Sequence, residues 1–84
     1  MNVNVRLMGW LREYLRPDIE QFDDKDFDLA DGITVGRLAE DLGFRAETDF
    51  MAMRNGQHVK PEVLDSTLLV EGDVVTYVPP LKGG

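Results

Sequence analysis

One strongly amphipathic segment, residues 34–43, stands among segments that alternate like strands, and it limits the folds open to this chain. Thr34 is a suitable N-cap and Gly43 a suitable stop, so we expect a helix between them. Gly36 lies inside this helix, where we interpret it as allowing close packing on a sheet. A single good helix predicts a core of one helix against one sheet. The apolar face at i, i+3, i+4 and i+7 consists of Val35, Leu38, Ala39 and Leu42.

The first and last apolar segments are typical of strands. Residues 2–8 place Val3, Val5 and Leu7 on one side and polar residues on the other, which is the period of a half-buried strand. Residues 74–78 are almost wholly apolar, which predicts a central strand buried on both faces. Because these two strands are the most apolar, we expect them side by side in the middle of the sheet, running in the same direction.

A hairpin and a connection precede the last strand. Residues 50–54 and 57–59 flank Asn55-Gly56, the preferred pair for a two-residue hairpin turn. The connection at residues 62–71 is expected to tuck three leucines against the core: Leu64, Leu68 and Leu69.

The remaining stretch predicts a short helix and an edge strand. Residues 10–15 carry apolar side chains at helical spacing, which predicts one or two turns ended by Pro17. Residues 18–31 are strongly acidic, and Phe27 and Leu29 alternate with aspartates there, which predicts a strand with a charged outer face. Such charges discourage edge-to-edge pairing, so we expect an edge position. The residues expected to face inward in the short helix are Trp10, Leu11, Tyr14 and Leu15.

This order of elements predicts an α+β fold, with a mixed sheet and one main helix packed on one face. It is the β-grasp, or ubiquitin-like, arrangement. We expect one domain over residues 1–78 and a flexible C-terminal tail over residues 79–84.

Composition argues against several classes of function. The 84 residues carry a net charge of −7, which disfavours a nucleic-acid binder. No apolar run approaches the ~20 residues of a membrane helix, and we expect no secretory signal. The chain has no cysteine, which leaves no thiol nucleophile or thiolate metal site and favours a cytoplasmic location.

Catalytic and metal-binding motifs are missing from the sequence or incomplete. His58, the only histidine, has no neighbouring nucleophile and is interpreted as a surface or cross-strand residue. Residues 24–28 resemble half of a calcium loop, but Leu29 stands where that loop requires glycine and Val35 where it requires glutamate. Neither a Walker loop nor a GxGxxG motif is present. We therefore expect no enzyme activity, no bound metal and no bound cofactor in this chain itself.

The C-terminal residues after the last strand form a thin stalk. Two prolines fix φ and stop the strand, and the two final glycines could be threaded into a narrow active site. Fully extended, the stalk would reach roughly 20 Å from the body. An ordinary frayed terminus is the simplest alternative. The stalk is Pro79-Pro80-Leu81-Lys82-Gly83-Gly84.

Together these motifs resemble the MoaD/ThiS family of ubiquitin-like sulfur carriers, most closely the small subunit of molybdopterin synthase. Two residues depart from that pattern. Met8 stands where an aromatic residue is usual, and we interpret it as a core substitution. Lys82 stands where a small neutral residue is usual. The stretch from Leu15 to Phe27 is longer and more acidic than expected. The matching segments are residues 5–13, Thr34-Val35 with Leu38, Asn55-Gly56, several residues within 67–75, and residues 78–84.

The resemblance implies that an E1-like adenylating enzyme uses ATP to activate the terminal carboxylate, which then becomes a thiocarboxylate. The large subunit of molybdopterin synthase would use that sulfur to build a dithiolene on a pterin. Alternatives are a carrier for thiamine or cysteine synthesis, a protein modifier and an interaction module without chemistry. Lys82 keeps the modifier open, because ubiquitin also has a basic residue before Gly-Gly. The implied site comprises Gly84 as reacting group, Gly83 as spacer, Pro79 and Pro80 as orienting residues, and Val78 and Leu81 as apolar anchors on the partner. Val78 and Leu81 are equally well interpreted as packing at the end of the strand.

Overall fold

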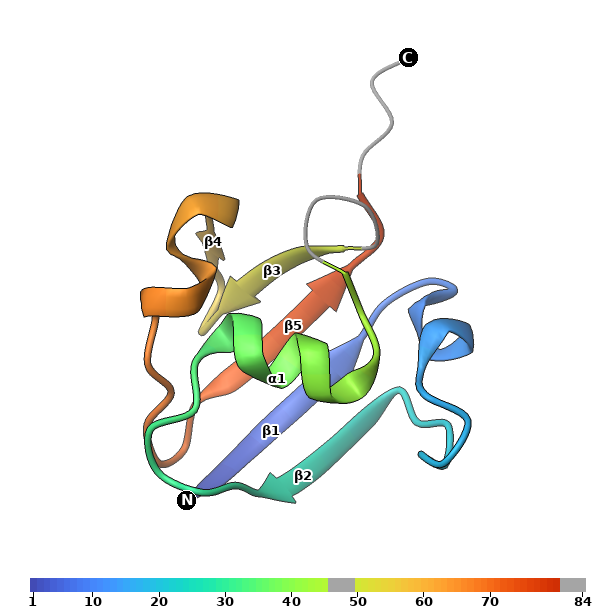
Figure 1. Cartoon of the computed structure of the whole chain (residues 1–84), viewed down its shortest axis with the longest axis horizontal. Helices are drawn as coiled ribbons and strands as arrows, with labels where there is room; N and C mark the ends of the chain where they lie inside the picture. Colours follow the sequence, from blue (N-terminus) through green and yellow to red (C-terminus); the bar gives the residue numbers. More distant parts are fainter. Residues whose placement is uncertain (46–49, 81–84) are drawn as a thin grey trace.

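A computed structural model describes residues 1–45 and 50–80, and in it a five-stranded sheet carries one α-helix on one face (Figure 1). The order of strands across the sheet is β2-β1-β5-β3-β4. Over these described ranges, no helix has the length and apolar character needed to cross a membrane. The elements are β1 (Asn2–Leu7), 3-10 helix η1 (Leu11–Tyr14), β2 (Asp24–Asp28), α1 (Val35–Leu42), β3 (Met51–Arg54), β4 (Gln57–Val59), 3-10 helix η2 (Pro61–Ser66) and β5 (Val74–Val78).

The centre of the sheet is a parallel pair formed by the first and last strands. β1 pairs with β5 in a register that sets Val5 beside Val75 and Leu7 beside Tyr77. β1–β2, β3–β5 and β3–β4 are all antiparallel. The predicted central pair, the predicted hairpin and the edge position of the acidic strand are therefore confirmed.

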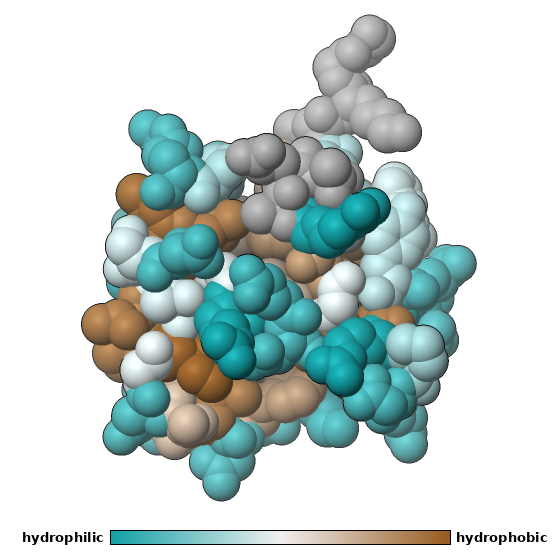
Figure 2. Space-filling view, viewed as in Figure 1, coloured by the Kyte–Doolittle hydropathy of each residue, from teal (hydrophilic) through white to brown (hydrophobic). Residues whose placement is uncertain are grey.

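The core lies between α1 and one face of the sheet. The helix is capped as predicted, since the Thr34 hydroxyl accepts a hydrogen bond from Arg37 N–H and the Gly43 N–H donates to the Ala39 and Glu40 carbonyls. Tyr77 contacts two phenylalanine rings at 5.2 and 5.7 Å between centroids. Figure 2 shows that the outer side of this helix layer is mainly hydrophilic. Buried side chains include Val3, Val5, Leu7, Val35, Leu38, Ala39, Leu42, Phe44, Phe50, Val75 and Tyr77.

Only one face of β5 is buried, so the prediction of burial on both faces is wrong. Val75 and Tyr77 are fully buried, whereas Val74, Thr76 and Val78 are half-exposed. The reason is that the described elements place α1 on a single side of the sheet (Figure 1). We call the other side of the sheet the open face.

The segment after β1 also differs from its prediction. Leu11 and Leu15 are buried, but Trp10 and Tyr14 are 49% and 48% exposed. Only one residue of each adjacent apolar pair faces the core around this 3-10 helix: Leu11 and Leu15 take the inward positions and leave Trp10 and Tyr14 outward.

The connection between β4 and β5 contains η2, an element that the sequence pattern did not predict. Leu68 is 55% exposed, contrary to prediction. Gly36 packs against η2 rather than on the sheet, because a Cβ there would overlap the Asp65 carboxylate and approach the Leu64 carbonyl carbon at 3.2 Å. The other two leucines of the connection are buried as predicted: Leu64 and Leu69.

Candidate functional site

The carboxyl end of β5 is held rigidly on both sides. The Met8 N–H donates to the Tyr77 carbonyl at 2.9 Å, so pairing with β1 continues to the end of the strand. The Tyr77 hydroxyl donates to the buried Val35 carbonyl at 2.8 Å. Burial raises the pKa of Tyr77 far above its ordinary value, because the charged form would lose its hydration. The strand that leads into the tail is thus fixed to α1 and to β1.

Gly9 lies directly against the first residue of the tail. Its φ of 59° is left-handed, and a Cβ at this position would approach Pro79 Cγ at 2.8 Å. A side chain here would therefore be strained and would displace the proline ring. The Gly9–Pro79 contact sets the direction in which the chain leaves the sheet.

Three of the seven predicted site residues are placed by the structure. Val78, Pro79 and Pro80 are half-buried at the end of β5. The other four predicted site residues lie outside the described residues: Leu81, Lys82, Gly83 and Gly84.

The open face beside Val78 is apolar. Met51 lies opposite Val78 and Met53 opposite Thr76 in the β3–β5 register. Met8 is 52% exposed, so its interpretation as a core substitution is wrong. It directly follows the inward-facing Leu7, and alternation along a strand turns it toward the open face.

The same face becomes acidic toward β2. Asp24, Asp26 and Asp28 lie opposite the polar residues of β1. The Asn4 side-chain amide donates to Asp24 at 2.7 Å and to Asp26 at 2.8 Å. Arg6 Nε is 3.5 Å from the other Asp24 carboxylate oxygen. The open face thus has an apolar half on β5 and β3 and an acidic half on β2, with β1 between them.

The sequence preceding β2 is tied back to η1 by an ion pair. Arg12 Nη1 donates to Asp23 Oδ1 at 2.7 Å, and this hydrogen bond raises the pKa of the Arg12 guanidinium. The Leu7 N–H donates to the Asp23 carbonyl at 2.8 Å. Asp23 therefore joins the acidic segment to the end of β1 that lies nearest the tail.

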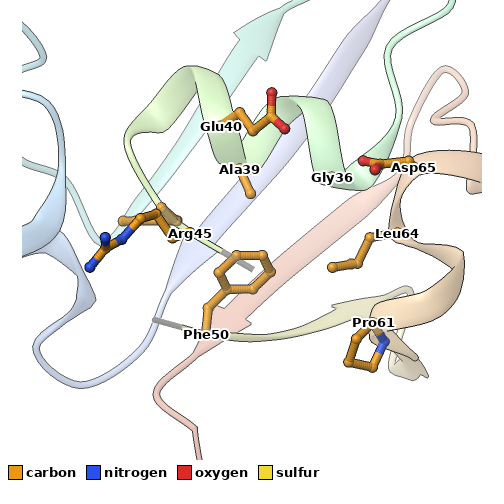
Figure 3. A pocket seen from close by; sticks show the side chains of 9 residues that line it. Gly36, Ala39, Glu40, Arg45, Phe50, Pro61, Leu64 and Asp65 are labelled. Atoms are coloured by element: carbon orange, nitrogen blue, oxygen red, sulfur yellow. The ribbon is translucent and has the colours of Figure 1, made fainter. Parts of the chain in front are cut away.

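A pocket of about 350 Å³ lies on the helix side, between α1, η2 and the start of β3 (Figure 3). Phe50 and Leu64 contribute apolar lining, and Glu40 and Asp65 contribute carboxylates along the side near α1. Residues 1–45 and 50–80 contain no group of three His, Asp or Glu side chains able to hold a metal. The described residues that line the pocket include no recognisable catalytic set.

His58 is exposed on β4, opposite Met53, as expected for a cross-strand residue. Sequence reasoning missed the roles of Gly9, Met51 and Met53 around the tail. The alternation in residues 50–54 was visible in the sequence, but assigning the methionines to the open face needs the β3–β5 register.

A family model described as the ThiS family matches residues 5–84. The chain belongs to the ThiS family. The match covers nearly the whole sequence, including the final Gly84. A comparison with curated proteins gave no match.

Solved structures similar to this ThiS-family chain share its β-grasp, ubiquitin-like fold. The Haloferax volcanii HVO 2177 protein is 24% identical, with a TM-score of 0.74 over 100% of this chain and 87% of that chain. Small archaeal modifier protein 1 of H. volcanii is 18% identical, with a TM-score of 0.67 over 95% and 98%. A chain from the complex of subunits 1 and 2 of molybdopterin-converting factor of Helicobacter pylori 26695 is 22% identical, with a TM-score of 0.59 over 100% of both chains.

Proposed function

We propose that this ThiS-family chain is a sulfur carrier whose Gly84 carboxylate is adenylated and converted to a thiocarboxylate for molybdopterin biosynthesis, the pathway of the molybdenum cofactor. The observation that carries the proposal is the family match, which runs through the terminal Gly-Gly. The hydrogen bond of Tyr77 and the Gly9–Pro79 contact support it, because they fix the point at which the chain leaves the sheet.

The chemistry needs a partner enzyme, since the sequence holds no nucleotide-binding motif. A carboxylate oxygen of Gly84 attacks the α-phosphorus of ATP and releases pyrophosphate. A sulfide-level donor then attacks the carbonyl carbon of the acyl adenylate, and AMP leaves with the carboxylate oxygen. The product is a thiocarboxylate, a nucleophile that a second enzyme can use. The chain itself acts as a carrier rather than as a catalyst.

The length of the tail also supports a docking surface near its base. Residues 79–84 span at most roughly 20 Å, so an enzyme that holds Gly84 must contact the body around Val78. The apolar half of the open face, with Met8 and Met51 beside Val78, is the surface that this enzyme would cover. The E1-like enzyme and the large subunit of molybdopterin synthase are the proposed partners. The H. pylori structure, a complex of two subunits of molybdopterin-converting factor, supports such a pairing.

Protein modification is the second candidate function. The likeness to small archaeal modifier protein 1 and the basic Lys82 before Gly-Gly favour it. In that reaction a lysine amine, instead of sulfur, displaces AMP and forms an isopeptide bond. Both functions share the adenylated Gly84, and carriage for thiamine or cysteine synthesis would share the thiocarboxylate as well.

Intact-mass analysis separates these outcomes. The purified protein is incubated with an E1-like enzyme, ATP and sulfide, and we expect a mass gain equal to sulfur minus oxygen. A variant that lacks Gly84 is the matched control and should remain unchanged. The thiocarboxylated protein, added to the large subunit and cyclic pterin monophosphate, should yield the dithiolene. Adducts on lysines of other proteins would support the modifier instead, and an unmodified wild-type protein would contradict both functions.

A further inference from the structure

Thioether side chains make up much of the apolar half of the open face. Met51 lies opposite Val78, Met53 lies opposite Thr76, and Met8 extends β1 at the same end of the sheet as the tail. None of these three methionines belongs to the buried core cluster. Met1 differs, because it packs against that cluster. The chain therefore separates three surface methionines from one that supports the core.

Methionine suits a surface that has to fit more than one enzyme. Its unbranched, polarisable side chain adapts to differently shaped partners, which is why it is frequent at promiscuous binding surfaces. The same thioether is open to oxidation, which converts it into a polar sulfoxide. Since the chain has no cysteine, its methionines hold all of its side-chain sulfur.

We propose that Met8, Met51 and Met53 form an oxidation-sensitive site through which peroxides switch off docking of the E1-like enzyme. The inference rests on the proposed function, because that enzyme is the first of the two partners proposed to dock on this face. In the reaction the methionine sulfur attacks one peroxide oxygen and the O–O bond breaks. The sulfur is oxidised by two electrons to the sulfoxide, and hydrogen peroxide is reduced to water.

A sulfoxide on this face weakens docking while the fold persists. Docking removes the apolar half from water, and a sulfoxide oxygen then loses its hydration without gaining a donor from an apolar partner surface. The core is unaffected, because Leu7 and Tyr77, on the other side of the same strands, hold the sheet against α1. Met8, the most exposed of the three at 52%, should be oxidised first.

The experiment compares the full-length protein with a Met8→Leu/Met51→Leu/Met53→Leu variant, which conserves volume and lacks the three thioethers. Both are treated with hydrogen peroxide, and peptide mass mapping reports the sulfoxide at each methionine, including Met1. Affinity for the E1-like enzyme, thiocarboxylate formation and thermal unfolding are then measured. We expect the oxidised wild type to bind the E1-like enzyme at least about tenfold more weakly than the untreated wild type, with its melting temperature retained. The affinity of the triple variant should not change on peroxide treatment. Methionine sulfoxide reductase should restore binding.

Two results overturn the inference alone: oxidised wild type that binds and reacts like the untreated protein, or a triple variant that loses as much affinity on treatment. If the untreated wild type acquires no thiocarboxylate and does not bind the enzyme, the proposed function fails and the inference fails with it. Since the untreated sample is measured in every case, the two failures are distinguishable.

Discussion

The two faces of the same sheet differ in composition and in whether α1 covers them. Successive residues of β1 and β5 alternate between them, so that Val75 and Tyr77 are buried under α1 while Val74, Thr76 and Val78 are half-exposed. The helix-covered face is apolar along the central strands β1 and β5 and accounts for the fold, while Lys25 and Arg54 share that face on the neighbouring strands β2 and β3. The open face is divided into an apolar half beside the tail and an acidic half on β2, a division that the fold does not require. The uncovered apolar half therefore points to a partner.

Adjacent residues of β1 give the sharpest test of this division. Leu7→Ala removes a buried side chain and should lower the free energy of unfolding by about 2–5 kcal/mol. Met8→Ala should change it by no more than about 0.5 kcal/mol, because Met8 is a surface residue. Urea unfolding measures both variants. For affinity to the enzyme the order of the two effects should reverse. Measured at a low temperature at which Leu7→Ala remains folded, Met8→Ala should bind the enzyme more weakly than Leu7→Ala does. Equal destabilisation by the two substitutions would remove the distinction between the faces.

Tyr77→Phe tests how firmly the covered face holds the strand that leads into the tail. The substitution removes the hydrogen bond from the Tyr77 hydroxyl to the Val35 carbonyl, which should cost about 0.5–1.5 kcal/mol of stability. It should also change the pH dependence. The folded-state pKa of Tyr77 is raised, so its contribution to stability is complete below pH about 10, the unfolded value, and is lost as the pH rises above it. Denaturant titrations at several alkaline pH values should show a steeper loss for the wild type than for Tyr77→Phe. Parallel curves would contradict the assignment.

Gly36→Ala tests the contact between α1 and η2 on the covered side. Overlap of the new methyl group with η2 should cost about 1–3 kcal/mol. Replacing glycine within a helix returns only about 0.5–1 kcal/mol, so the net effect should be destabilising. Adding Asp65→Ala, with Asp65→Ala alone as the control, should recover part of the loss. A stabilised Gly36→Ala protein would show that η2 can shift to accommodate the methyl group without lowering the free energy of unfolding.

The smallest effect is expected on the acidic half of the open face. Asp24→Asn, Asp26→Asn and Asp28→Asn remove charges that are exposed in the sheet. Each should change stability by no more than about 0.5 kcal/mol, since exposed ion pairs contribute little. Thermal unfolding at low and high salt measures the change. A large loss of stability would mean that this half supports the fold rather than facing outward.

Much of the covered face could be predicted from sequence because periodicity reports burial directly. Three local patterns each determine the structure of their own segment within a few residues: the alternation of Val3, Val5 and Leu7, the cap at Thr34 and the turn at Asn55-Gly56. The open face could not be predicted in this way. Whether Val74 and Val78 are covered depends on which elements pack on that side of the sheet, and none of the elements in residues 1–45 and 50–80 forms a second layer there.

Tertiary contacts explain the other differences. Gly36 could be recognised as a close-packing position, but the element it approaches, η2, comes almost thirty positions later in the chain. The spacing of Trp10 and Tyr14 equals that of Leu11 and Leu15, so spacing alone could not decide which pair faces the core; the structure buries the leucines. For the candidate site, the terminal Gly-Gly and double proline were readable from sequence. The Gly9–Pro79 contact was not, because it depends on the parallel pairing of the two central strands.

That parallel pair has a consequence for how the protein comes into being. Among the described strands, β1 is synthesised first and its central partner, β5, last. Such pairing over nearly the whole sequence gives a high contact order, so the sheet closes late and slowly compared with locally paired folds. A chain that is interrupted before residue 74 lacks both the middle of its sheet and the base of its tail. Folding of the sheet and presentation of the tail are thereby tied to a single strand.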